Sequence, residues 1–339
     1  MIRVLVAEDS PTARELLVSL LRSDPELEVV GEAHNGEEAV AAVQRLHPDV
    51  VTMDVRMPIL DGFEATRRIM TECPTPIVIV SASIDMRDVE NSMRALRAGA
   101  LAILPKPVGP RSPEFEREAQ EFLSTVRSMS QVKVVRRWPE RAARPPTEAR
   151  RAEVPRILAI AASTGGPPAI QTVLAGLPAA FPAPIVLVQH IAAGFVRGFA
   201  AWLDGSCPFQ VSLGAEGMPL RAGAVHVAPD DCQMGLAAGE VLRLSSSPAV
   251  DGFRPSASYL FASVARAFGP AAVCVILTGM GKDGVAGLRA VRERGATILA
   301  QDEETCVVYG MPKAVVEAGL ADEILPLHAI APRLIDLFR

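Results

Sequence analysis

Short apolar runs alternate with amphipathic stretches along the first third of the chain. The apolar runs lie at residues 2–7, 27–30, 50–53, 77–80 and 101–104. Continuous runs of this length are typical of strands that are buried on both faces of a parallel sheet. The stretches between them, for example residues 11–21 and 36–46, have helical periodicity. The pattern predicts a first α/β domain over residues 1–128 with a doubly wound parallel sheet.

The same alternation resumes in the second half of the chain. Its apolar runs lie at residues 157–161, 185–189, 224–228, 272–277 and 297–300. Helical or loop-like stretches separate these runs, and no motif of the first half is repeated. We therefore predict a second doubly wound, Rossmann-like α/β domain over residues 154–339.

The segment between the two domains, residues 129–153, contains several prolines and is rich in arginine. Two interpretations fit this composition: a solvated tether whose charges repel one another, or a docking strip for an acidic partner. We adopt the tether, because runs of like charge are commonly solvated.

Composition supports two packed cores and excludes several functional classes. A chain of 339 residues with 49% hydrophobic and 4% aromatic residues is expected to build two aliphatic α/β cores. The net charge of -5 argues against a nucleic-acid-binding surface over the whole molecule. The five cysteines are scattered without CxxC pairs, as expected of reduced thiols. The sequence shows neither a signal peptide nor a membrane-length apolar run, so we expect a cytoplasmic protein without membrane insertion.

Polar side chains follow the predicted strands of the first domain. Glu8 and Asp9 follow the first strand, Asp54 the third, Ser81 the fourth and Lys106 the fifth. In a doubly wound sheet these positions meet at one edge. Three carboxylates in one place repel one another unless a cation joins them, and an all-oxygen ligand set suits Mg2+. Beside such a metal, Asp54 can act as a nucleophile toward a phosphoryl group, which Lys106 and Ser81 would stabilise. Each residue taken singly also fits a helix cap.

A hydroxyl, an imidazole and a carboxylate occupy the corresponding positions of the second domain. Ser163 lies in a glycine-rich turn after the first strand, His190 directly follows the second, and Asp283 lies in a glycine-rich turn after residues 272–277. These are the places expected of a nucleophile, its base and the acid that orients the base. Capping or core roles for His190 and Asp283 remain alternatives.

The glycine-rich turn after Ser163 has a second interpretation as a phosphate cradle. Neither GxGxxG nor GxxxxGK[ST] is present, which disfavours nucleotide binding. The GxSxG elbow of the α/β-hydrolases is also missing, and the order Ser, His, Asp differs from theirs. A hydrolase of another family is indicated.

The motifs of the first domain resemble a response-regulator receiver domain. They are Ala7-Glu8-Asp9-Ser10, Met53-Asp54-Val55-Arg56-Met57-Pro58 with Asp61-Gly62, Ser81-Ala82 and Leu104-Pro105-Lys106-Pro107. The resemblance implies a flavodoxin-like fold and phosphorylation of Asp54 by a chemotaxis histidine kinase. It also implies that Glu8, Asp9 and Asp54 hold Mg2+ and that Ser81 and Lys106 respond to the phosphate. The first acidic position is Glu8 rather than the commoner Asp.

The motifs of the second domain resemble the CheB family of chemotaxis protein-glutamate methylesterases. They are Ala162-Ser163-Thr164-Gly165-Gly166, Gln189-His190, Thr278-Gly279-Met280-Gly281-Lys282-Asp283-Gly284 and the segment 301–312. The family carries a receiver, a linker and a catalytic domain in this order, so the resemblance covers the whole chain. It implies that Ser163, His190 and Asp283 form the triad and that Thr164 and Met280 support the site.

The resemblance further implies the substrate, which is a γ-glutamyl methyl ester on a methyl-accepting chemotaxis receptor. Ester hydrolysis would need no cofactor, and some members of the family also deamidate receptor glutamines. The domain order suggests that the receiver blocks the esterase site until it is phosphorylated. The alternatives are a catalytically silent docking module and a transcriptional regulator. The latter would need a helix-turn-helix output domain, which the second half lacks.

Overall fold

The computed structural model describes residues 1–81, 95–96, 98–107, 109, 112–113, 115–132, 155–237 and 240–339. The chain divides into two compact units, Met1–Pro139 and Glu140–Arg339. Most of the predicted linker, residues 133–153, lies outside the described part. Residues 129 and 130 belong to the last helix of the first unit, so that helix passes the expected domain end at residue 128.

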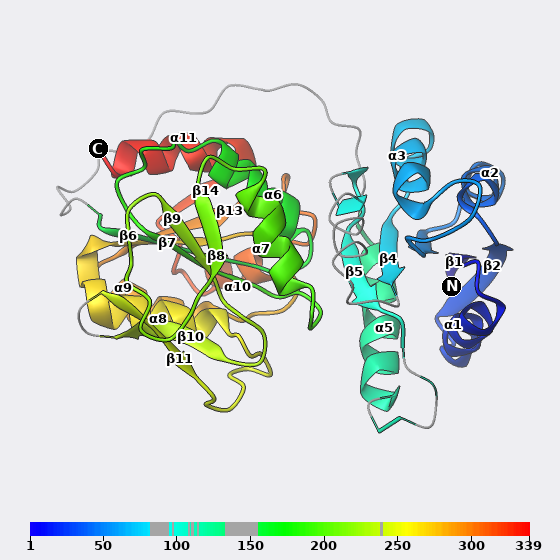
Figure 1. Cartoon of the computed structure of the whole chain (residues 1–339), viewed down its shortest axis with the longest axis horizontal. Helices are drawn as coiled ribbons and strands as arrows, with labels where there is room; N and C mark the ends of the chain where they lie inside the picture. The colour runs from blue at the N-terminus through cyan, green and yellow to red at the C-terminus, as the bar shows by residue number, and fades with distance from the viewer. Residues whose placement is uncertain are drawn as a thin grey trace. The chain divides into compact units, whose positions relative to one another are not determined.

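As predicted, the first unit contains a five-stranded parallel sheet (Figure 1). The strand order is β2-β1-β3-β4-β5. The strands are β1 (Ile2–Ala7), β2 (Leu27–Ala33), β3 (Val50–Met53), β4 (Ile77–Ser81) and β5 (Ala102–Pro105). The helices are α1 (Pro11–Ser23), α2 (Gly36–Leu46), α3 (Gly62–Glu72) and α5 (Phe115–Ser130). Helix α1 packs on α5 and α2 packs on α3, so these pairs form separate layers.

The second unit is a seven-stranded parallel sheet in the order β14-β13-β12-β6-β7-β9-β8. Its strands are β6 (Ile157–Ala162), β7 (Ile185–Gln189), β8 (Gln210–Leu213), β9 (Ala224–Val227), β12 (Ala272–Ile276), β13 (Thr297–Gln301) and β14 (Glu323–Leu325). Its helices are α6 (Gly166–Ala175), α7 (Val196–Asp204), α8 (Ala257–Phe268), α9 (Val285–Glu293), α10 (Met311–Glu317) and α11 (Leu327–Leu337), with a short 3-10 turn at Gly269–Ala271. The predicted fold class is confirmed in both units.

Four strands of the second unit are absent from the sequence prediction. Strands β8 and β14 lie at the two edges of the sheet, and all their residues except Val211 are partly or fully exposed. Edge strands of this kind lack the continuous apolar run that marks a strand buried on both faces. The other two, β10 (Gln233–Ala237) and β11 (Val241–Ser245), form an antiparallel hairpin outside the main sheet.

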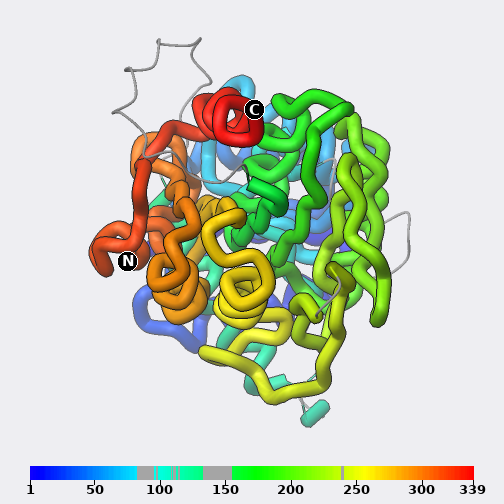
Figure 2. Tube along the Cα trace, turned by 90° about the vertical axis from the view of Figure 1, so that its left-hand side faces the viewer, coloured from blue at the N-terminus to red at the C-terminus, as the bar shows by residue number. Residues whose placement is uncertain are grey.

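Helices cover both faces of the seven-stranded sheet. On one face, alternate residues of β6, β7, β12 and β13 form one core with α8, α9 and α10. The hairpin contributes Met234 and Leu242 to this core. Helices α8 and α9 pack side by side, as Figure 2 shows in yellow and orange. Helices α6 and α11 pack together on the opposite face (Figure 1). Among the described residues, no helix combines the length and apolar character needed to cross a membrane.

Candidate functional site

Strand register brings Ser163 and His190 to neighbouring positions. Ala162 of β6 is paired with Gln189 of β7, and Ser163 and His190 each follow directly. The His190 amide donates to the Ala162 carbonyl (3.0 Å), which extends the pairing by one residue. Neighbouring strands lie about 4.8 Å apart, so Ser163 and His190 occupy adjacent positions at the same edge of the sheet.

The third strand at this edge is β12, which borders β6 on the side away from β7. The Ser163 amide donates to the Thr278 carbonyl (3.0 Å), just beyond the end of β12. Strand order changes direction here, since the chain leaves β6 toward β7 and later returns to β12. Such a switch point is where ligands bind in open α/β sheets.

Asp283 is buried and surrounded by hydrogen-bond donors. Its carboxylate accepts from Ser256 Oγ (2.9 Å) and from the amides of Ala257 (2.7 Å), Ser258 (3.0 Å) and Gly284 (2.8 Å). The first three donors lie at the start of α8, where the helix dipole also favours a negative charge. Burial by itself raises the pKa of Asp283, but His190 and these amides outweigh it and lower the pKa to about 2. Asp283 is therefore ionised at neutral pH.

The imidazole of His190 is held between a carboxylate and an aromatic ring. Nε2 lies 3.0 Å from Asp283 Oδ2. The Phe253 ring stacks on the imidazole, with 4.1 Å between centroids and 3° between planes. Both ring nitrogens are buried, and neither meets the geometric criteria of a hydrogen bond in the described part of the chain. With Nε2 facing the acid, Nδ1 is the nitrogen left to accept a proton.

Two glycines let the loops around Ser163 approach closely. Gly165 has a φ of +74°, and a Cβ there would lie 2.4 Å from Val307 Cβ. A Cβ on Gly279 would lie 2.8 Å from Ser163 Cβ. The glycines of these motifs are therefore required by the packing of the serine turn against neighbouring loops.

Thr164 and Met280 lie beside these contacts. The Thr164 carbonyl accepts from Thr278 Oγ1 (3.0 Å), which ties the serine turn to the loop after β12. Met280 follows Gly279 in that loop, and the residue is 40% exposed. Their supporting roles remain predictions.

Three buried glutamines join the site loops, and the sequence prediction assigned none of them a role. Gln189 Nε2 donates to the carbonyls of Ser163 (2.8 Å) and His190 (2.7 Å). Gln301 accepts from the Thr278 amide (2.8 Å). Gln233 bonds to the loop that carries Phe253. An amide side chain at the end of an otherwise apolar strand is the signal that marks Gln189 and Gln301 in the sequence.

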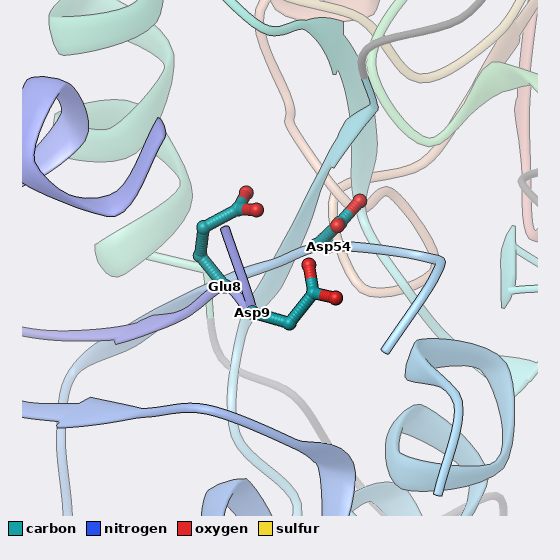
Figure 3. Close-up of side chains that lie close together, drawn as sticks. All are labelled: Glu8, Asp9 and Asp54. Carbon is teal, nitrogen blue, oxygen red and sulfur yellow. The ribbon is translucent and has the colours of Figure 1, made fainter. Parts of the chain in front are cut away.

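The acidic residues of the first unit also come together as predicted. Glu8, Asp9 and Asp54 each offer a carboxylate oxygen within 4.8 Å of the others. Figure 3 shows these three side chains close together. Glu8 and Asp54 are buried, whereas Asp9 is exposed. Gly62 permits this packing, since a Cβ there would lie 1.9 Å from the Asp54 carbonyl oxygen.

Lys106 lies directly against these carboxylates. Its Nζ is 2.7 Å from Glu8 Oε2 and 2.9 Å from Asp54 Oδ2. The Lys106 amide donates to the carbonyl of Ser81 (2.9 Å), the last residue of β4, which is buried. The structure therefore places all five predicted residues at one sheet edge.

The charges of this cluster fit a divalent cation. Burial raises the pKa of both Glu8 and Asp54, and their contacts with Lys106 oppose the rise. One ammonium group does not balance three carboxylates, and the all-oxygen ligand set is the kind that Mg2+ prefers. Glu8, Asp9 and Asp54 are the residues that would hold the ion.

The two units define a class of protein in which an acidic receiver-type site is joined to a hydrolase-type serine, histidine and aspartate site. Comparison with family models agrees with this geometry. The CheB methylesterase model matches residues 158–334, and the response regulator receiver domain model matches residues 4–112. The chain belongs to the CheB methylesterase family and carries a receiver domain, as its motifs predicted.

Similar proteins extend over the whole chain. The protein-glutamate methylesterase/protein-glutamine glutaminase 4 of Myxococcus xanthus is 53% identical, covering 100% of this chain and 97% of the relative. The corresponding protein 3 of Anaeromyxobacter dehalogenans is 54% identical, covering 98% of each. The crystal structure of the Thermotoga maritima CheB methylesterase catalytic domain is 40% identical, with a TM-score of 0.53, and covers 54% of this chain and 98% of that domain.

Proposed function

We propose that the chain is a phosphorylation-activated protein-glutamate methylesterase that hydrolyses γ-glutamyl methyl esters on chemotaxis receptors. The observation that carries the proposal is the contact between His190 Nε2 and Asp283 Oδ2 beside Ser163. The names of the similar proteins support the substrate class.

In the proposed reaction, Ser163 Oγ attacks the ester carbonyl while His190 Nδ1 takes its proton. Asp283 remains ionised and stabilises the imidazolium. The imidazolium then protonates the departing methoxide, and methanol leaves. Water then attacks the acyl-enzyme while His190 takes its proton. The imidazolium returns this proton to Ser163 Oγ as the bond to the serine breaks and the free glutamate leaves.

Negative charge develops on the carbonyl oxygen during both steps. We assign its stabilisation to backbone or hydroxyl donors of Thr164 and Met280. These residues follow Ser163 and Gly279 in the two loops that meet at the serine. Hydrogen-bond donors aimed at such an oxyanion typically contribute about 10²-fold or more to the rate.

The same acyl-enzyme route accepts a glutamine side chain, with ammonia leaving in place of methanol. We include glutamine deamidation in the proposal because the similar proteins are named for both activities.

Asp54 is the proposed phosphate acceptor, and a chemotaxis histidine kinase is the proposed donor. Mg2+ held by Glu8, Asp9 and Asp54 would neutralise phosphoryl charge. Lys106 and Ser81 would contact the phosphate and change the surface of the domain in response to it.

Five free cysteines fit a reducing compartment, so we place the chain in the cytoplasm.

The experiment that tests the proposal is methanol release from methyl-labelled receptor membranes. Wild-type protein should release methanol, and Ser163→Ala should not. Ser206 is another half-buried serine of the same unit, so Ser206→Ala is the control and should match wild type. Acetyl phosphate with Mg2+ should raise the wild-type rate but not that of Asp54→Asn.

The competing proposal is a docking module without catalysis. A fluorophosphonate reagent separates the two, because an activated serine attacks its phosphorus and is phosphonylated as fluoride leaves, whereas a merely structural serine does not react. Absence of both labelling at Ser163 and methanol release from folded protein would favour the docking module.

A further inference from the structure

One loop contacts both partners of the histidine–aspartate pair. The loop spans residues 248–256, between β11 and α8. Near its middle, Phe253 stacks on His190 with 3° between the planes. At its end, Ser256 Oγ donates to Asp283 Oδ1 (2.9 Å). The position of this loop therefore affects the imidazole and the carboxylate together.

Gln233 holds this loop at three points. Its Nε2 donates to the carbonyls of Pro248 (3.2 Å) and Phe253 (3.1 Å), and its Oε1 accepts from the Ser256 amide (2.9 Å). The Gln233 side chain is fully buried at the first position of β10. A short reciprocal pair between Val250 and Phe253 closes the tip of the loop (3.0 and 2.9 Å), but it does not connect the tip to the rest of the unit.

We infer that Gln233 is a positioning residue for the esterase reaction and that it acts through Phe253 and Ser256 on His190 and Asp283. The inference rests on the proposed function. The flat face of Phe253 limits rotation of the imidazole about its contact with Asp283. This restraint fixes the direction in which Nδ1 points. Displacement of a reacting group by about 1 Å can cost about 10²-fold in rate.

The first test is Gln233→Met in the full chain, which keeps the length of the side chain and removes its three loop contacts. Because Gln233 positions groups for the chemical step and does not bind substrate, kcat should fall about 10-fold. KM for methylated receptor should stay within about twofold. Phe253→Leu should have a similar effect. Phe253→Tyr retains the aromatic ring and should have the wild-type kcat.

Ser263→Ala is the matched control. Ser263 is buried, donates to the Leu260 carbonyl and accepts from the Leu236 amide, so it also joins α8 to β10. It does not bond to the loop of residues 248–256 in the described part of the chain. Its kcat should equal that of wild type, which separates loop positioning from general weakening of this layer.

The second test repeats the substitutions in a His190→Ala background. Residues that act through His190 should have no further effect once the imidazole is gone, since members of one catalytic unit are strongly non-additive. Equal losses in both backgrounds, or a wild-type kcat for both Gln233→Met and Phe253→Leu, would overturn the inference. No Ser163-dependent release by the wild type would overturn the proposed function itself. If Gln233→Met does not fold, the two Phe253 variants decide the outcome.

Discussion

His190 Nε2 and Asp283 Oδ2 lie 3.0 Å apart, and four hydrogen-bond donors fix Asp283. The carboxylate is therefore oriented by the start of α8 as well as by the histidine. This arrangement stabilises an imidazolium while the acid itself stays ionised, as a serine hydrolase requires.

Replacement of Asp283 by Asn should lower kcat by about 10⁴-fold with little change in overall fold. The amide lacks the negative charge that stabilises the imidazolium, and it favours the wrong histidine tautomer. Methanol release at saturating receptor measures the effect. Asp204→Asn is the control, because Asp204 also accepts a hydrogen bond from a backbone amide. This variant should retain wild-type kcat. A fall of less than about tenfold for Asp283→Asn would contradict the assigned role.

Asp283 should also make the stability of the second unit depend on acid pH. Its pKa is lowered from 3.8 to about 2 in the folded state. A group with a depressed folded pKa contributes stability that is present above pH 4 and lost as the pH falls through 2. The shift corresponds to about 2 kcal/mol. Urea unfolding of wild type and Asp283→Asn between pH 5 and pH 2 should show the difference in unfolding free energy shrinking by about this amount. A constant difference would contradict the lowered pKa.

Gly165→Ala should lower both stability and activity. The positive φ costs about 1 kcal/mol for a residue with a Cβ. The clash with Val307 adds about 1–3 kcal/mol and displaces the serine turn. Gly217→Ala is the matched control, since its φ is +71° and a Cβ there meets nothing within 4 Å. Gly217→Ala should lose only the stability that corresponds to the positive φ, and it should keep the wild-type kcat. Thermal unfolding and methanol release measure the two effects, and equal behaviour of the variants would contradict the steric argument.

Lys106→Met should destabilise the first unit in the absence of metal. The substitution leaves Glu8 and Asp54 buried without the ammonium group that contacts both, at a cost of about 2–4 kcal/mol. Mg2+ should recover much of the loss because it replaces the missing positive charge. Thermal unfolding with Mg2+ or with a chelator tests this. Lys313→Met, which removes an exposed ion pair with Glu317, should change neither melt. Identical melts for Lys106→Met with and without Mg2+ would argue against a metal site here.

Much of the fold was predictable because central parallel strands are buried on both faces and appear as continuous apolar runs. The run at residues 185–189 matches β7 residue for residue. Strands β8 and β14 were missed because each has a neighbour on only one side and is partly exposed. Their weak pattern comes from their place at the sheet edge, which depends on strand order.

The sequence by itself determined the positions of Ser163 and His190, because each directly follows an apolar run that becomes a central strand. It also determined the acidic cluster around Asp54 for the same reason. Only the tertiary structure decided what fixes His190 and Asp283. Ser256 precedes Asp283 by 27 residues, and they meet because α8 packs against the edge where β12 ends. Phe253 and Gln233 act through a loop whose place depends on the β10–β11 hairpin, and hydrophobic periodicity carries no information about such long-range contacts.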